Sequence, residues 1–129
     1  VNLYGCDVGE NSFIGPFVEI QKNTKIGKNC RIQSHTFICE KVKIGDDCFI
    51  GHGVMFTNDK FANGGPSGKK FILPTNVGNK VSIGSNSTIL PIKICSNVVI
   101  GAGSVVTKDI TRSGKYAGNP AKLLKKWFF

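Results

Sequence analysis

Two histidines, His35 and His52, are the only side chains of this 129-residue chain that ordinarily change charge near neutral pH. A histidine held beside an amine or a hydroxyl group can accept the proton that this group loses as it attacks a carbonyl carbon. We expect His35 to be the proton acceptor. His52 lies between Gly51 and Gly53, so its position is also explained by a turn, and we expect it only to contact a substrate.

A six-residue repeat organises the chain that must position these histidines. Aliphatic residues recur every six positions, glycine often follows them, and the fourth residue after each is small or β-branched. Neither an α-helix nor a strictly alternating strand produces a period of six. The aliphatic series runs through Val8, Ile14, Ile20, Ile26, Ile32, Ile38, Ile44 and Ile50 to Phe56, and resumes at Val77, Ile83 and Ile89 and then, with one residue missing, at Ile94, Ile100 and Val106.

The repeat predicts an all-β fold. Six residues form a short strand and a bend, and a few such steps make a coil that pairs with its neighbours at about 4.8 Å. We expect one domain over residues 1–129, with residues 57–76 as a side loop. Asn119 and Pro120 are typical first residues of an α-helix, which predicts a short C-terminal helix over 119–129 that covers the end of the column.

Stacking of the coils brings the polar candidates together. If a coil has three steps, residues eighteen apart stack, so His52 lies above Ser34 and Asn58 lies above Glu40. His35 then lies diagonally beneath His52, and a second subunit would supply the opposite wall of the pocket. The residues expected to gather near the base of the loop are His35, His52, Glu40, Asn58 and Asp59.

Charge and composition restrict the kinds of protein this chain can be. Lysine and arginine number 17 against 8 acidic residues, but no nucleic-acid motif or aromatic stripe accompanies them. The basic residues form two clusters, which suit a small polyanionic ligand as well as a duplex. No apolar stretch approaches the roughly 18–20 residues of a membrane helix, and no secretory signal is visible, so we expect a cytoplasmic location and no membrane insertion.

The five cysteines are odd in number and form no CxxC pair, which argues against a disulfide framework and against a zinc site. Cys30 and Cys48 are eighteen residues apart in the slot for small side chains. We expect them to stack inside the coils as small hydrophobic residues. Cys39 and Cys95 occupy the slot that glycine usually holds, and nothing near them indicates a nucleophile.

The hexapeptide series, the loop, the segment IGAGSVVTKDI and the closing AGNPAKLLKK together resemble the hexapeptide-repeat acyltransferases, whose fold is a left-handed parallel β-helix. The segment IQSHTFICEKVKIGDDCFIGHGVMFTND is similar to the sugar N-acetyltransferases of surface polysaccharide and lipopolysaccharide synthesis. Within this group, the segment resembles the enzymes that act on dTDP-3-amino-3,6-dideoxyhexoses most, and the UDP-3-amino-glucuronate acetyltransferases next. The resemblance implies a homotrimer with each site between two subunits, acetyl-CoA as co-substrate, no metal and a nucleotide-linked amino sugar. It also implies that Asn58 and Asp59 line the sugar site, with Asn58 taking part in catalysis.

The last coils and the tail are the expected coenzyme A site, which the resemblance supports as a region. Small residues let the backbone approach a ligand closely, and cationic side chains meet the 3′-phosphate and the pyrophosphate. The oxyanion donor is expected to be a backbone N–H. The expected cofactor-binding residues are Gly101, Ala102, Ala117 and Gly118 for the backbone, and Lys108, Arg112, Lys122 and Lys125 for the phosphates.

Other functions fit parts of the pattern. An O-acetyltransferase of the serine or galactoside type would need a histidine within reach of a hydroxyl group, and it remains an alternative. A γ-class carbonic anhydrase would need three histidine ligands, and this chain has two. A non-enzymatic solenoid is a second alternative, although the outward threonine ladders of an ice-binding protein are missing.

Overall fold

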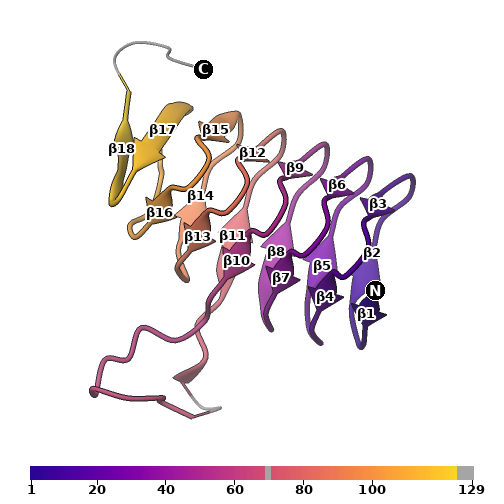
Figure 1. Ribbon diagram of the computed structural model, residues 1–129, viewed down its shortest axis with the longest axis horizontal. Coiled ribbons are helices and arrows are strands. Elements are labelled where there is room, and N and C mark those ends of the chain that lie inside the picture. Colours follow the sequence, from indigo (N-terminus) through magenta and orange to yellow (C-terminus); the bar gives the residue numbers. More distant parts are fainter. Residues whose placement is uncertain (69–70, 125–129) are drawn as a thin grey trace.

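The chain winds into a column with three β-sheets along its sides (Figure 1). The computed structural model describes residues 1–68 and 71–124. Sheet A contains β1 (Asn2–Leu3), β4 (Glu19–Ile20), β7 (Phe37–Ile38), β10 (Met55–Phe56), β13 (Thr88–Ile89) and β16 (Val105–Val106). Sheet B contains β2 (Asp7–Val8), β5 (Lys25–Ile26), β8 (Val42–Ile44), β11 (Thr75–Val77) and β14 (Lys93–Ile94). Sheet C contains β3 (Phe13–Ile14), β6 (Arg31–Ile32), β9 (Phe49–Ile50), β12 (Ser82–Ile83), β15 (Val98–Ile100), β17 (Gly114–Gly118) and β18 (Ala121–Leu123).

The predicted all-β solenoid and its register are confirmed. From β2 to β10, strands pair in parallel with the residue eighteen positions on, as Ile32 does with Ile50. The offset is 17 residues between β1 and β4, 33 across the side loop, 17 after it and 16 between β15 and β17. The repeated aliphatic side chains point inward, and those from Ile20 to Phe56 are at most 3% exposed. Val8 is an exception at 37%, because it lies in the first coil, which is covered on one side only.

We name the turns between sheets the A/B, B/C and C/A corners, in the order in which the chain passes them. Glycine follows the aliphatic residue at most B/C and C/A corners because the next coil leaves no room for a side chain. A Cβ on Gly51, for example, would lie 2.7 Å from the backbone nitrogen of Ser85. At the A/B corner this slot instead holds Gln21, Cys39 and Thr57, and there the side loop begins.

Buried hydroxyl and thiol groups in the small slot donate hydrogen bonds between coils. Thr36 donates to the Gly51 carbonyl at 2.8 Å, and Cys30 donates in the same way to Gly45 at 3.1 Å. The thiols of Cys30 and Cys48 therefore pack inside the coils, as predicted. The Thr75 hydroxyl is buried without a partner among the described residues, because the turn after Ile89 is one residue shorter.

The two irregular parts of the fold are the side loop and the end of the column. The loop runs from the end of β10 to the start of β11 and hangs away from the column in Figure 1. The predicted C-terminal helix is wrong as far as Leu124. Residues 119–120 form a turn, and β18 pairs antiparallel with β17, so a hairpin covers the end of the column. An Asn–Pro pair is typical of turns as well as of helix starts; residues 125–129 lie outside the described part.

Candidate active site

Both histidines lie on the C/A corner, one coil apart. His35 has a left-handed backbone conformation, with φ of 64°, and its N–H donates to the Pro16 carbonyl one coil below. His52 lies one coil above Ser34, as predicted. Two rows of residues therefore run along this corner, parallel to the column. The row of His35 contains Phe17, His35, Gly53, Asn86 and Gly103, and the row of His52 contains Pro16, Ser34, His52, Ser85 and Ala102.

Different contacts hold the two imidazoles. A hydrogen bond of 2.9 Å joins His52 Nδ1 to the Ser34 hydroxyl, and the His52 backbone N–H donates to Ser85 Oγ. The His35 ring stacks on the ring of Phe17, with centroids 5.0 Å apart and planes inclined by 26°. His35 makes no side-chain hydrogen bond with residues 1–68 or 71–124, so its ring nitrogens are available to a substrate.

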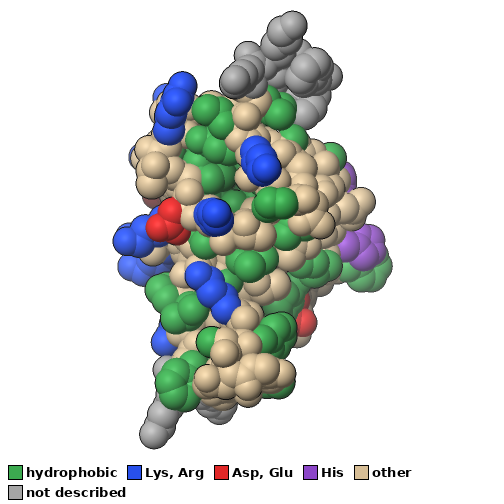
Figure 2. All heavy atoms as spheres, turned by 90° about the vertical axis from the view of Figure 1, so that its left-hand side faces the viewer, with side chains coloured by type: hydrophobic (Ala, Val, Ile, Leu, Met, Phe, Trp, Pro, Cys, Tyr) green, Lys and Arg blue, Asp and Glu red, His purple; other side chains and the backbone are tan. Residues whose placement is uncertain are grey.

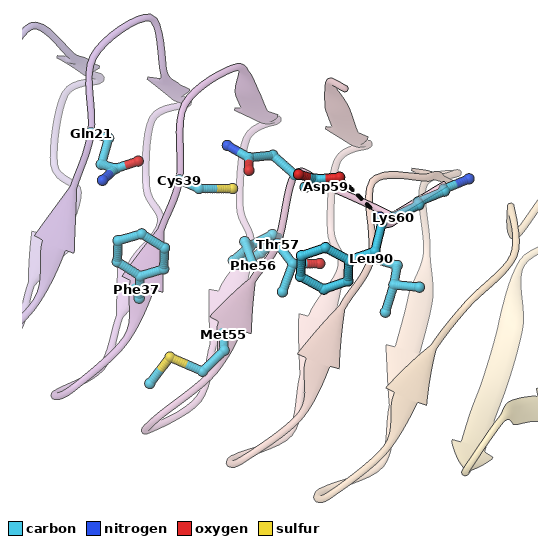
Figure 3. Close-up of a pocket in the computed structure, with 11 residues that line it drawn as sticks. Gln21, Phe37, Cys39, Met55, Phe56, Thr57, Asp59, Lys60 and Leu90 are labelled. Atoms are coloured by element: carbon cyan, nitrogen blue, oxygen red, sulfur yellow. Dashed lines mark hydrogen bonds between the residues drawn. The ribbon is translucent and has the colours of Figure 1, made fainter. Parts of the chain in front are cut away.

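A cavity of about 580 Å³ opens at the A/B corner, where the side loop leaves sheet A (Figure 3). Its walls are mainly apolar, and the Asn58 side chain is half-buried among them, without a hydrogen bond to the residues that the structure describes. A wall of this kind suits the hydrophobic parts of a ligand, and one amide can orient its polar group. The lining residues are Gln21, Phe37, Cys39, Met55, Phe56, Thr57, Asn58, Asp59, Lys60, Phe61 and Leu90.

Asp59 holds the side loop together. Its carboxylate accepts hydrogen bonds from the Ser67 N–H at 2.6 Å, from the Ser67 hydroxyl at 2.9 Å and from the Phe61 N–H at 2.9 Å. The backbone N–H groups of Ser67 and Phe61 stabilise the carboxylate and lower the pKa of Asp59 below its ordinary value of 3.8. The geometry therefore assigns Asp59 a structural contact in the loop, in addition to its place in the cavity wall.

Glu40 lies outside the cavity wall. Its carboxylate is 3.6 Å from the Lys22 ammonium, and its backbone N–H donates to Gln21 Oε1. An ion pair at this half-exposed position contributes little to stability. Glu40 is thus occupied by a neighbouring side chain on the outside of the A/B corner.

The five polar candidates do not form one pocket in a single chain, which corrects the sequence-based expectation. His35 and His52 lie on the C/A corner, whereas Glu40, Asn58 and Asp59 lie on the A/B corner. The strands of sheet A separate the two groups, because each six-residue step crosses one side of the column. This separation could have been predicted from the sequence, since His35 precedes the strand Phe37–Ile38 and Glu40 follows it.

The residues expected to bind coenzyme A also fall into two groups, one that lies together and one that lies elsewhere on the column. Gly101 and Ala102 continue the C/A corner above His52, and the Gly101 N–H donates to the Tyr116 carbonyl of β17. Gly118 donates to Ser104 Oγ, and Ala117 pairs with Lys122 across the hairpin. The structure therefore brings together Gly101, Ala102, Ala117, Gly118 and Lys122.

Two other cationic candidates lie elsewhere. Lys108 lies on the A/B corner and Arg112 on the B/C corner, and both are exposed. Lys125 lies outside the described residues. Of the described cationic candidates, Lys122 is therefore the one that lies in the hairpin beside Ala117.

Cys39 lies in the cavity wall but does not supply a nucleophile. The side chain is buried, and burial raises the pKa of its thiol to about 11. A thiol with this pKa is protonated at neutral pH, whereas a reactive cysteine is a thiolate. Its role is structural, as the sequence predicts.

The eighteen-residue register predicts Ser34 beneath His52, and the structure adds a hydrogen bond between the two side chains. Sequence reasoning missed Phe17, whose ring contacts the His35 ring. Counting eighteen residues back from His35 identifies Phe17, so a signal was present. The apolar wall of the cavity, including Phe37 and Met55, could not be recognised from the sequence. Hydrophobic side chains at outward positions do not disturb the six-residue repeat, so they leave no signal in it.

Comparison with known families and proteins agrees with this architecture. Residues 5–40 and 23–58 match the bacterial transferase hexapeptide model of six repeats, and residues 74–108 match the hexapeptide repeat of succinyl-transferase. Over 61 residues the chain is 43% identical to the galactoside O-acetyltransferase of Escherichia coli, a match that covers 46% of this chain and 30% of that protein. The chain thus matches less than a third of the length of the curated relatives compared.

Solved structures share the fold over nearly the whole chain. A galactoside acetyltransferase in complex with coenzyme A is 32% identical, with a TM-score of 0.80, over 93% of this chain and 64% of that one. A perosamine N-acetyltransferase mutant from Caulobacter crescentus, in complex with CoA and GDP-perosamine, has a TM-score of 0.83 over 97% of this chain and 53% of that one. Its identity is 20%, which supports the fold alone.

No helix among the described residues has the length and apolar character needed to cross a membrane.

The repeat, the three-sheet column and the two family matches, which together cover residues 5–58 and 74–108, lead to one conclusion. This chain belongs to the bacterial transferases of the hexapeptide-repeat family.

Proposed function

We propose that this protein transfers the acetyl group of acetyl-CoA to the amino group of a nucleotide-linked amino-deoxysugar, such as a dTDP-3-amino-3,6-dideoxyhexose. The product would serve the synthesis of lipopolysaccharide or another surface polysaccharide in the cytoplasm. The observation that carries the proposal is the C/A corner, where His35 and His52 share two rows with the small residues Ala102 and Gly103. A proton acceptor and a backbone open to a ligand thus lie along one edge.

The reaction needs alignment more than covalent help from the protein. The sugar amine attacks the thioester carbonyl, a C–N bond forms, the C–S bond breaks, and coenzyme A leaves as the thiol. In the proposal, His35 accepts the proton of the amine and returns it to the departing sulfur. A backbone N–H stabilises the oxyanion, which is worth about 2.7–4 kcal/mol for one donor. Alignment of amine and thioester can contribute more, roughly 7–11 kcal/mol at best.

We further propose that the complete site forms between subunits of a homotrimer. His35 and the Asn58 cavity lie on opposite edges of sheet A, so one chain by itself does not bring them together. Outward hydrophobic side chains on both sheets next to the C/A corner, Met55 and Phe49, are about 41% exposed. A second copy covering these faces would bring its own A/B corner towards this histidine edge.

A hydroxyl acceptor is the second candidate. The galactoside O-acetyltransferase relative and the 32% identical galactoside acetyltransferase structure favour it. The mostly apolar cavity beside Asn58 instead favours a deoxysugar, because a methyl group gains from apolar walls whereas a hydroxymethyl group needs hydrogen-bond partners.

The deciding experiment measures thiol release from acetyl-CoA with a panel of acceptors. The panel contains dTDP-3-amino-3,6-dideoxyhexoses, a UDP-3-amino sugar, a GDP-4-amino sugar, and galactosides and serine as hydroxyl acceptors. We expect release with an amino sugar, and its loss in His35→Gln. Release with hydroxyl acceptors alone would move the assignment to the O-acetyl class, and release with none would contradict both.

A further inference from the structure

Phe17 occupies its position against two general preferences. Its side chain is 73% exposed in the single chain, so packing within the chain does not explain a phenylalanine there. Its backbone has a φ of 60°, a left-handed conformation that bulky residues rarely adopt. Higher in the same row, His35 shares that conformation at 64°, and beyond it the positions hold Gly53 and Asn86, the two residue types that adopt it readily. An outlier of this kind is a reason to look for a function.

Among residues 1–68 and 71–124, the one aromatic contact of the Phe17 ring is with His35. The His35 N–H donates to the Pro16 carbonyl at 3.1 Å, which sets His35 one coil above Phe17. The ring centroids are 5.0 Å apart and the planes are inclined by 26°, within the range of favourable aromatic stacking. On the other side of His35 the row continues with Gly53, which has no side chain to hold the imidazole.

We infer that Phe17 is a positioning residue that fixes the orientation of the His35 imidazole by stacking against its face. The inference rests on the proposed function, in which His35 accepts the proton of the substrate amine. Stacking against one face leaves both ring nitrogens at the edge, where a substrate can reach them. Since the described residues give His35 no side-chain hydrogen bond, its imidazole would otherwise turn among several rotamers.

This role explains why a residue unsuited to the backbone and to solvent stands at position 17. A stacked aromatic pair is worth a modest free energy, which corresponds to about 2- to 10-fold in the population of the correct rotamer. The turnover number kcat should fall by the same factor when the ring is removed. KM for acetyl-CoA should stay within about twofold, because Phe17 only orients the base.

The test compares Phe17→Asn with Phe17→Tyr. Asparagine suits a positive φ better than phenylalanine does, so Phe17→Asn keeps or raises the melting temperature while it removes the ring. Tyrosine retains the ring and should restore kcat. The matched control is Lys80→Asn, the same replacement at an exposed position with φ of 54° on the B/C corner, away from both histidines.

A second readout does not depend on activity. The chain has only two histidines, so single His→Gln variants assign their ring-proton NMR resonances. We expect Phe17→Asn to shift the His35 resonances through the lost ring current, and to leave those of His52 in place. Lys80→Asn should move neither.

Three outcomes overturn the inference: unmoved His35 resonances in Phe17→Asn, an unchanged kcat in that variant, or an equal loss of kcat in Phe17→Tyr. Failure of the proposed function looks different. In that case the wild-type protein releases no thiol with any acceptor, while the NMR comparison still decides whether Phe17 orients His35.

Discussion

Asn58 and Asp59 are neighbours in the chain, yet the fold uses their side chains differently. The Asp59 carboxylate accepts three hydrogen bonds inside the loop, whereas the Asn58 amide stands in the cavity wall and bonds to none of the described residues. His35 and His52 differ similarly, since one is stacked and the other is hydrogen-bonded. At the scale of single residues, Asn58 and His35 have groups free for a substrate.

Replacing Asn58 with alanine should therefore lower kcat/KM for the amino-sugar acceptor by about 10-fold, the cost of one lost hydrogen bond to a substrate. Steady-state thiol release checks this. The control is Asn63→Ala, the same change at an exposed loop residue outside that cavity, with an effect below about twofold. Equal effects of both variants would mean that the cavity at the base of the loop is not the sugar site.

Asp59 makes the order of the loop depend on pH. Its pKa is lowered in the folded protein, so its contribution is complete above the ordinary value of 3.8 and is lost as pH falls through the lower folded value. We expect the Ser67 amide proton resonance to titrate with a midpoint below 3.8. In Asp59→Asn this titration should disappear. A midpoint at or above 3.8 would contradict the hydrogen-bonded carboxylate.

Each coil is held to the next by paired strands and by side-chain donors at the corners. The Thr36 hydroxyl bonds to the Gly51 carbonyl, but the equally buried Thr75 hydroxyl has no partner among residues 1–68 and 71–124. The difference arises from the shortened turn around Pro91, which shifts the carbonyl that Thr75 would otherwise meet. At the scale of the element, one missing residue changes the energetic value of a threonine.

The two threonines should consequently respond differently to the same substitution. Thr36→Val removes a buried hydrogen bond and leaves a carbonyl without its donor, so we expect a loss of about 1–3 kcal/mol in unfolding free energy. Thr75→Val removes an unsatisfied hydroxyl and should be neutral or stabilising. Denaturant unfolding of both variants measures the difference, and a larger loss in Thr75→Val would contradict the assigned hydrogen bonds.

The sides of the column differ in chemical character. Sheet B turns the exposed lysines Lys25, Lys43 and Lys93 outward, whereas sheets A and C turn out Met55 and Phe49. Figure 2 shows lysine and arginine gathered on one side and histidine on the opposite side. At the scale of the whole molecule, the histidine corner lies between the two sides with outward hydrophobic residues, which are the ones that self-association would cover.

A double variant, Phe49→Glu with Met55→Glu, should therefore dissociate the proposed trimer into monomers, because two carboxylates would be buried without partners. Sedimentation equilibrium measures the mass. Lys25→Glu with Lys43→Glu is the control on sheet B and should remain trimeric. A monomeric wild-type protein, or dissociation in the control pair alone, would contradict the assignment of the faces.

Much of the fold could be predicted because it follows from a one-dimensional rule. A six-residue step turns the same side chain inward at every step, so the buried series from Ile20 to Phe56 and the eighteen-residue register can be counted from the sequence. The chain's end could not be counted in this way. Asn119 and Pro120 suit a helix start and a turn alike, and pairing with β17 selected the turn.

The candidate site was likewise predictable from the sequence only in part. The sequence by itself determined that His52 stacks over Ser34, because both occupy one position of the repeat. Only the tertiary structure decided that the strands of sheet A separate the histidines from Asn58, and that an exposed Phe17 ring lies against His35. The physical reason is that a repeat specifies which residues lie above one another, whereas side-chain directions and the bends between sheets depend on contacts among all the coils.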